Sequence, residues 1–365
     1  MKNYFFIILF ALVFTKASYS ENLTKQDLLK MSPSQIIVHA KNGDPTAQLW
    51  LGDAIFNGSI PNSRSYSSCE WYYRSAEQNN SEAAFKLYNY IRVFENLGKI
   101  FDCPKVIVVK KTNLNKNYWL LKSARLQNRE AQFELWKISK DNSEKLNWLK
   151  KSAEKEYPPA MINLAKYLSG QIFYLKLEKK DLDKALSLLI KASKASNKNS
   201  DADYELANLF SNKLYFDYIN LHKSALKKGN QENADYWLKE ANTQNFKSHF
   251  NIKKAIKFAN NCINKSMEFR CYELVIDFYT EDQFKNLNYE KARALLNEAE
   301  EYLKEEKDYH RVLFLKGKAF LRWPNLKKNK LEANKYFKKA KETLMKSNKK
   351  DPMISIYEKW ISYTS

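Results

Sequence analysis

The stretch Trp71-Tyr72-Tyr73-Arg74-Ser75-Ala76-Glu77-Gln78-Asn79, followed by Ala83 and Leu87, contains a spacing that recurs along the chain. A tryptophan, a Ser-Ala pair four and five residues later, an alanine at twelve and a leucine at sixteen occur together three times. The three copies are Trp71, Ser75, Ala76, Ala83, Leu87; Trp119, Ser123, Ala124, Ala131, Leu135; and Trp148, Ser152, Ala153, Ala160, Leu164. Five residue types in one register indicate a repeat array, and such arrays generally bind other molecules.

Weaker copies extend the array in both directions. The upstream copy keeps the offsets at Ala40, Ala47 and Leu51, although its aromatic residue is missing. Downstream, Trp237-Leu238 with Ala241 is one of the degenerate copies. We therefore predict about eight units, starting near residues 35, 71, 119, 148, 188, 237, 295 and 336.

Each unit is expected to be a pair of antiparallel helices. Offsets 0, 1, 4 and 5 from the tryptophan lie on one helix face, with a bulky residue at one end and small residues at the other. Six residues rich in turn formers follow, and Asp44-Pro45 is a strong helix start. Only 7 glycines and 8 prolines occur in 365 residues, which also favours helices. We predict an all-α solenoid that runs as one array over residues 21–365.

The best-preserved copies resemble a known repeat family. The residues Ala47-x3-Leu51-Gly52-x5-Gly58, together with the Trp71–Asn79 segment, look like a Sel1-like repeat, which is related to the tetratricopeptide repeat. The stretches 160–170 and 202–212 match more weakly, so the resemblance is specific over 35–210 and degenerate over 211–350. It implies a superhelix that makes protein contacts, commonly in bacterial envelopes.

The N-terminus has the pattern of a secretory signal peptide. Lys2 is followed by an apolar run from Phe5 to Phe14 and then by small residues, which predicts a signal peptide over residues 1–20 with cleavage near Ser20. The run is too short for the roughly 20 residues that span a bilayer, although an uncleaved anchor is the alternative. No later apolar run reaches membrane length. A periplasmic or secreted location is therefore expected.

Export affects the interpretation of the four cysteines. They show no CxxC spacing and no histidine cluster, so no metal site is expected. An even number in an oxidising compartment favours disulfides, with buried free thiols as the alternative. Proximity in sequence suggests Cys69–Cys103 and Cys262–Cys271. The resemblance implies that the second pair joins the end of one helix to the start of the next.

The chain is strongly basic. Its formal net charge is +21, and removing Lys2 and Lys16 with the signal peptide leaves +21 − 2 = +19. Many of the lysines lie between 327 and 350. Export makes a nucleic-acid partner unlikely, so we expect an acidic protein partner or anionic envelope components. A solvated lysine face without a partner is the alternative.

Catalytic motifs are sparse. We find no HExxH, no GxSxG and no glycine-rich phosphate loop, and no cofactor is expected. Ser152-Ala153-Glu154-Lys155 matches S-x-x-K, but the other motifs of penicillin-recognising enzymes are missing. Ser152 also occupies a position that repeats as a packing residue. The sequence thus favours a non-enzymatic exported protein–protein interaction module, with a hydrolase acting on peptidoglycan or β-lactams as the alternative.

A row of polar residues is the candidate partner-binding site. Each member lies six residues after the repeat alanine, where an exposed side chain is expected. The row comprises Asp53, Asn89, Lys137, Lys166 and Asn208, and residues two positions after the alanine, including Phe85 and Tyr204, would flank it. By analogy with related helical repeats, these residues would line a concave groove. A solvated helix edge is the alternative.

Overall fold

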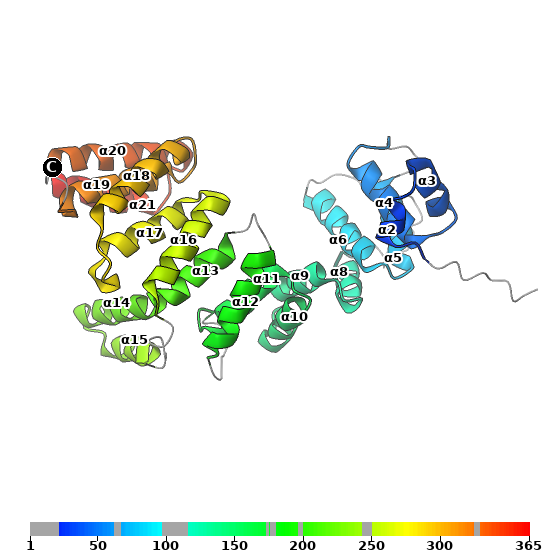
Figure 1. Cartoon of the computed structure of the whole chain (residues 1–365), viewed down its shortest axis with the longest axis horizontal. Helices are drawn as coiled ribbons and strands as arrows, with labels where there is room; N and C mark the ends of the chain where they lie inside the picture. The colour runs from blue at the N-terminus through cyan, green and yellow to red at the C-terminus, as the bar shows by residue number, and fades with distance from the viewer. Residues whose placement is uncertain are drawn as a thin grey trace, which may run out of the picture. The chain divides into compact units, whose positions relative to one another are not determined.

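The computed structural model describes residues 22–61, 67–96, 116–172, 175, 180–195, 200–242, 250–324 and 329–365. Their regular structure consists of nineteen α-helices and one 3-10 helix, so the predicted all-α class is confirmed (Figure 1). The chain divides into two compact units, Met1–Lys155 and Glu156–Ser365. The single array over 21–365 stays a prediction. The predicted signal peptide and Cys103 lie outside the described residues.

The first unit contains three helix pairs. Its helices are α2 (Lys25–Leu28), α3 (Pro33–Lys41), α4 (Pro45–Phe56), α5 (Ser68–Glu77), α6 (Ser81–Asn96), α8 (Lys116–Arg125), α9 (Arg129–Ile138) and α10 (Asn142–Glu154). Helix α4 packs against α5, α6 against α8, and α9 against α10. Helix α3 precedes these pairs and packs on α4. Each pair therefore combines an Ala-x3-Leu helix with the Trp-containing helix that follows it.

The second unit contains four helix pairs and an inserted hairpin, and the second helices of these pairs lack the tryptophan. Its elements are α11 (Pro158–Leu168), α12 (Leu182–Ala195), α13 (Asp201–Phe210), α14 (Lys213–Lys227), α15 (Gln231–Asn242), α16 (Ile252–Ser266), α17 (Phe269–Thr280), η2 (Asp282–Phe284), α18 (Tyr289–Leu303), α19 (Tyr309–Arg322), α20 (Lys330–Ser347) and α21 (Met353–Thr364). The pairs are α11 with α12, α13 with α16, α17 with α18, and α19 with α20. Helix α21 packs on α20. The described residues thus contain seven pairs in the series and the hairpin α14 with α15, close to the predicted number of about eight.

Three of the predicted turns begin the next helix in the same way, whereas α11 begins after Tyr157 without a side-chain cap. A side-chain oxygen of Asp44, Asn80 or Asn128 accepts a hydrogen bond from the repeat alanine three residues later, at 2.7, 3.0 and 2.8 Å. The residue before each cap has a positive φ, at Gly43 (105°), Asn79 (64°) and Gln127 (66°). Left-handed backbone here reverses the chain, which explains why glycine, asparagine and polar residues fill this segment.

The serines that recur in the repeats hold neighbouring helices together. Each repeat serine is buried and donates a hydrogen bond to the first-turn carbonyl of the neighbouring helix. The bonds run from Ser75 Oγ to Pro45 O (2.6 Å), from Ser123 Oγ to Ser81 O (2.7 Å) and from Ser152 Oγ to Arg129 O (2.7 Å). A carbonyl in the first turn has a free lone pair, and a buried hydroxyl needs a partner, so both groups are satisfied together.

Glycine allows the closest approach between paired helices. A Cβ at Gly52 would lie 2.7 Å from the ring of Tyr72, and a Cβ at Gly317 would lie 2.4 Å from the ring of Phe337. The two glycines hold equivalent places, since each lies in the first helix of a pair and faces an aromatic residue of the second. An aromatic ring thus fills the space that a larger residue would occupy.

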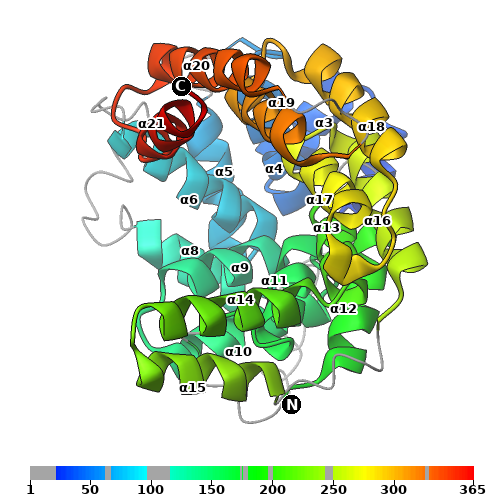
Figure 2. The same ribbon diagram turned by 90° about the vertical axis from the view of Figure 1, so that its left-hand side faces the viewer.

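Helices α14 and α15 interrupt the series of pairs. They pack mainly on each other, whereas α13 packs directly against α16 (Figures 1 and 2). The two ends of the insertion meet, because Asn251 N–H donates to Phe210 O at 2.8 Å. The ring centroids of Phe210 and Phe258 lie 5.7 Å apart in a stacked arrangement near the same place. The predicted repeat near residue 237 is therefore wrong, because Trp237 belongs to the hairpin and α16 takes the repeat position.

A buried ion pair joins the start of α13 to the end of α16. Lys265 Nζ lies 2.6 Å from Asp203 Oδ2, and the Asp203 side chain is fully buried. The same ammonium donates to Ser193 O of α12 at 3.1 Å, and Ser193 Oγ donates to Asp203 Oδ1 at 2.9 Å. The consecutive helices α12 and α13 thus share one polar cluster with α16, which is distant from both in sequence.

One of the two expected disulfides is confirmed. Cys262 in α16 bonds Cys271 in α17, and both residues are fully buried. It joins the end of one helix to the start of the next, as the resemblance implied. Cys69 is buried in the first turn of α5. Its expected pairing with Cys103 stays a prediction.

Candidate functional site

The predicted binding row is distributed over five helices of the two units. In the first unit, Asp53 lies in α4, Phe85 and Asn89 in α6, and Lys137 in α9; in the second, Lys166 lies in α11, and Tyr204 and Asn208 in α13. Lys137 is exposed, and the other six are half-buried. The expectation of an exposed row is therefore wrong for most members, because neighbouring helices cover part of each side chain.

Asp53 connects three helices of the first unit. Its Oδ1 accepts a hydrogen bond from the hydroxyl of Tyr72 in α5 at 2.7 Å, and the ammonium of Lys86 in α6 lies 3.1 Å away. Burial raises the pKa of Tyr72 and the bond to Asp53 raises it further, so the phenol stays protonated and donates. Asp53 therefore acts first as a packing residue.

Aromatic rings and cations alternate along α6 and α9. The Phe85 and Tyr88 rings stack 5.9 Å apart, and the Arg92 guanidinium lies over the Tyr88 ring at 5.6 Å. In α9, Lys137 forms an ion pair with Glu134 and lies 5.5 Å from the centre of the Phe133 ring. The exposed cations Arg92 and Lys137 and the half-buried rings of Phe85 and Phe133 suit acidic and apolar groups of a protein partner, whereas Tyr88 is buried.

Members of the row in the second unit are also in contact with neighbouring helices. Lys166 lies 3.0 Å from Glu205 of α13, whose side chain is 8% exposed. The Arg270 guanidinium of α17 lies over the Tyr204 ring at 5.1 Å. Asn208 lies one helical turn beyond Glu205 on α13. Polar residues here stabilise the packing of α11, α13 and α17 as well as forming a surface.

Sequence analysis missed a recurring partner of this row. Lys86 and Glu205 each lie three residues after a repeat alanine, and each pairs with the row residue of the preceding Ala-x3-Leu helix, namely Asp53 and Lys166. The opposite charges at these two offsets are visible in the sequence. Pairing them would have predicted that the row is partly used between helices.

Structural contacts account for Ser152 and for the histidines His222 and His310. The Ser152 hydroxyl is buried and donates to Arg129 O. The two equivalent serines are also buried, and each donates to a carbonyl of its own neighbouring helix. His310 is buried, its Nδ1 lies 2.7 Å from the Tyr357 hydroxyl, and burial lowers its pKa. His222 Nδ1 lies 2.8 Å from Ala234 O. Within the described ranges, no group of three or more His, Cys, Asp or Glu side chains could hold a metal ion.

Among the described residues, no helix combines the length and the apolar composition needed to cross a bilayer.

Comparison with known proteins gives similarity in structure only. No protein-family model matches the chain, and no curated protein matches it. A Sel1 repeat protein from Oxalobacter formigenes has 15% identity and a TM-score of 0.49, covering 91% of this chain and 87% of that one. The protective antigen c5321 of uropathogenic Escherichia coli, which displays an SLR fold, has 18% identity and a TM-score of 0.43, covering 91% and 71%.

A third similar structure is a human IFIT1 dimer with m7Gppp-AAAA. It has 13% identity and a TM-score of 0.40, covering 90% of this chain and 76% of that one. The fold itself follows from the helix pairs, with their repeated serine bonds, caps and left-handed turn residues. The described chain is an all-α solenoid of helix pairs, as its resemblance to Sel1-like repeats implied.

Proposed function

We propose that this chain is an exported, non-catalytic protein-binding module of the bacterial envelope. The observation that carries the proposal is the use of the repeat serines, whose hydroxyls are buried and bonded to backbone carbonyls. Groups that could have supplied nucleophiles stabilise helix packing instead. The exposed surface of the repeats is then available for binding, and the surfaces of helical repeats bind proteins.

The partner is expected to be acidic. The mature chain would carry a net charge of +21 − 2 = +19 after loss of Lys2 and Lys16. A positive field accelerates association with acidic proteins and with anionic envelope components. Arg92 and Lys137, beside aromatic rings in the first unit, are suited to the same chemistry.

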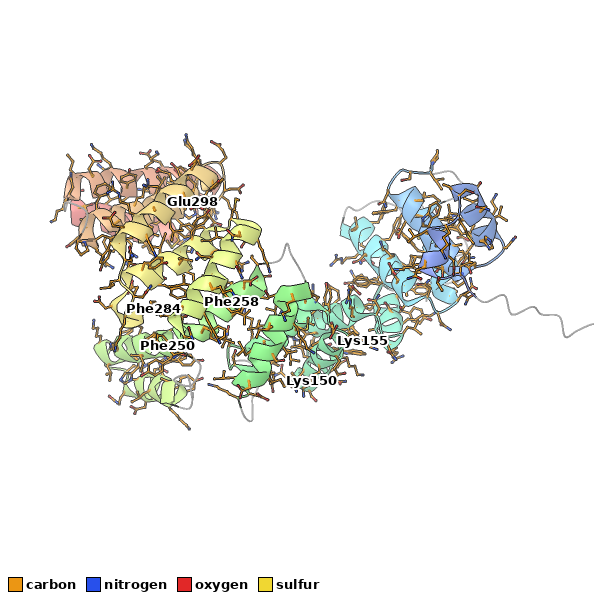
Figure 3. All side chains as sticks on the ribbon, in the orientation of Figure 1. Lys150, Lys155, Phe250, Phe258, Phe284 and Glu298 are labelled. Atoms are coloured by element: carbon orange, nitrogen blue, oxygen red, sulfur yellow. A yellow bond between two sulfur atoms is a disulfide. The ribbon has the colours of Figure 1, made fainter. Side chains whose placement is uncertain are left out.

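Position-specific crosslinking tests the proposed surface. A photoreactive residue is placed at Lys137 on α9, or at the exposed Lys150 on α10 as the matched control in the same unit (Figure 3). After export and irradiation, we expect a defined product from position 137 and none from position 150. Equal products from both positions, or none from either, would contradict the proposed surface.

The number of partners distinguishes two versions of the function. An inhibitor or immunity-type protein would crosslink to one toxin-like protein in stoichiometric amount, whereas an adaptor or scaffold would crosslink to several envelope enzymes. Mass spectrometry of the products from position 137 separates these outcomes.

The hydrolase alternative has a direct test at Ser152. The substitution Ser152→Ala is measured with a chromogenic β-lactam and with peptidoglycan. Since the hydroxyl is bonded to Arg129 O, we expect no turnover by either form. Turnover that disappears in the alanine variant while its circular dichroism spectrum is retained would establish the hydrolase. Ser123→Ala, which removes the equivalent bond to Ser81 O, is the matched control.

A further inference from the structure

Helix α20 has two opposite faces. Its buried face consists of Ala333, Phe337, Ala340 and Leu344, and packs toward α19 and α21 (Figure 2). The opposite face follows the same helical period. We call it the lysine stripe, which comprises Leu331, Lys335, Lys338, Glu342, Met345 and Lys346 on the helix, together with Lys349 in the turn that follows it. All seven residues are exposed, so no described helix covers this face.

The stripe combines positive charge with exposed apolar side chains. Leu331 is 67% exposed and Met345 is 37% exposed. Within the described residues, the ammonium groups of Lys338, Lys346 and Lys349 form no ion pair, whereas Lys335 pairs with Glu332. Glu342 is the single acidic member. Leu331 and Met345 lie fourteen residues apart, or about 21 Å along the helix axis.

We propose that the lysine stripe docks on an anionic membrane surface, with lysines near lipid phosphates and Leu331 and Met345 entering the headgroup region. A basic helix face with apolar residues has this affinity for anionic bilayers. Long lysine stems allow apolar neighbours to approach the lipid while the ammonium groups stay hydrated.

The composition of the stripe favours lipid over an acidic protein. All of its cations are lysines, whose flexible point charges suit a diffuse anionic surface, whereas the arginine fork suits fixed carboxylate pairs. The stripe also lacks the aromatic residues that usually anchor protein interfaces. The inference specifies the anionic envelope component in the proposed function as a lipid surface. It rests on the proposed export only in one respect, which is the identity of the membrane that the chain meets.

Vesicle binding tests the inference without any protein partner. The chain beginning at Glu21 is mixed with vesicles of phosphatidylglycerol and phosphatidylcholine in equal parts, or of phosphatidylcholine alone, and co-sedimentation is measured. We expect binding to the anionic vesicles that weakens with salt, since about 0.1 M salt screens charges beyond about 10 Å. Lack of binding to anionic vesicles, or equal binding to both kinds, would overturn the inference.

Charge-neutralising variants locate the binding to the stripe. The triple variant Lys338→Gln/Lys346→Gln/Lys349→Gln should bind roughly 100-fold more weakly, because each lysine near a membrane surface contributes about fivefold. The matched control neutralises Lys150, Lys155 and Lys257, which are equally exposed and lie outside α20. Equal loss in both triple variants would show that only net charge matters and would overturn the assignment.

The apolar members distinguish lipid from a general polyanion. Leu331→Ser should weaken vesicle binding by about tenfold, because a side chain that enters the headgroup region loses its apolar contact. The same substitution should leave binding to poly-glutamate unchanged. If poly-glutamate binds as tightly as the vesicles and Leu331→Ser changes neither, the partner is an acidic protein and the membrane assignment fails. Unchanged circular dichroism confirms that each variant is folded.

Discussion

The buried pair of Asp203 and Lys265 provides the strongest test of the inserted hairpin, because it exists only if α13 packs against α16. The substitution Lys265→Met removes the ammonium that lies 2.6 Å from Asp203 Oδ2. The carboxylate would then stay fully buried with the hydroxyl of Ser193, at 2.9 Å, as its remaining partner. Leaving one charge of a buried pair without the other typically costs about 3–5 kcal/mol.

Substitution of the other partner, Asp203, should reduce the free energy of unfolding by less. In Asp203→Leu, Lys265 keeps its bond to Ser193 O, and its side chain, 18% exposed, can turn toward water. We therefore place this loss near the lower end, at about 3 kcal/mol. The double variant Asp203→Leu/Lys265→Met should recover most of the stability, since an apolar pair of similar volume often replaces a buried ion pair at little cost.

Urea unfolding and local hydrogen exchange measure the effect. Because long repeat arrays need not unfold in one step, exchange of the amides in α12, α13 and α16 reports the local free energy. A loss of about 4 kcal/mol corresponds to roughly 10 °C in Tm for a unit of this size. A double variant as unstable as the sum of the two single variants, or a Lys265→Met variant with unchanged exchange, would refute the reasoning.

Three further predictions concern packing, covalent closure and pH. Gly52→Ala should destabilise the first unit by about 1–3 kcal/mol through overlap with the Tyr72 ring, and urea titrations should show a smaller cost of the same substitution in a Tyr72→Leu background. Cys262→Ala/Cys271→Ala should cost about 2.5 kcal/mol by the same measurement, because a bridge across nine residues restricts the unfolded chain. Burial lowers the pKa of His310 below 6.5, so the unfolded state takes up a proton first as the pH falls. Thermal stability should therefore decline below pH 6.5 and recover above it, and His310→Gln should flatten this dependence.

The helix pairs of the first unit could be predicted from spacing alone. Trp71, Ser75 and Ala76 mark one helix, and the asparagine or aspartate cap marks the next, because each repeat meets the same packing requirement. The prediction failed at Trp237. Its Trp-Leu-x-x-Ala pattern describes any amphipathic helix with one large and one small end, and the hairpin helix α15 satisfies it equally well. Helix α16 was missed because Phe258 and Cys262 replace the usual tryptophan and serine.

The candidate row was predicted only in part. Its polar character at each repeat was correct, but exposure depends on the neighbouring helix, and periodicity within one helix does not report that neighbour. Lys86 covers Asp53, and Glu205 covers Lys166. Opposite charges stand three residues after the repeat alanine of one helix and six residues after the repeat alanine of the preceding Ala-x3-Leu helix. These charges would have indicated the pairing. The lysine stripe of α20 shows the opposite case, because its residues meet no neighbour among the described helices.

The bond between Asn251 N–H and Phe210 O also has a consequence for synthesis on the ribosome. All other pairs join segments that emerge close together in time, so they can assemble as translation proceeds. Helix α13, in contrast, is made forty residues before its companion and leaves Phe210 uncovered during that delay. This closure is the most non-local step of the second unit and is expected to set its pace, because distant segments must meet before any contact compensates their lost freedom.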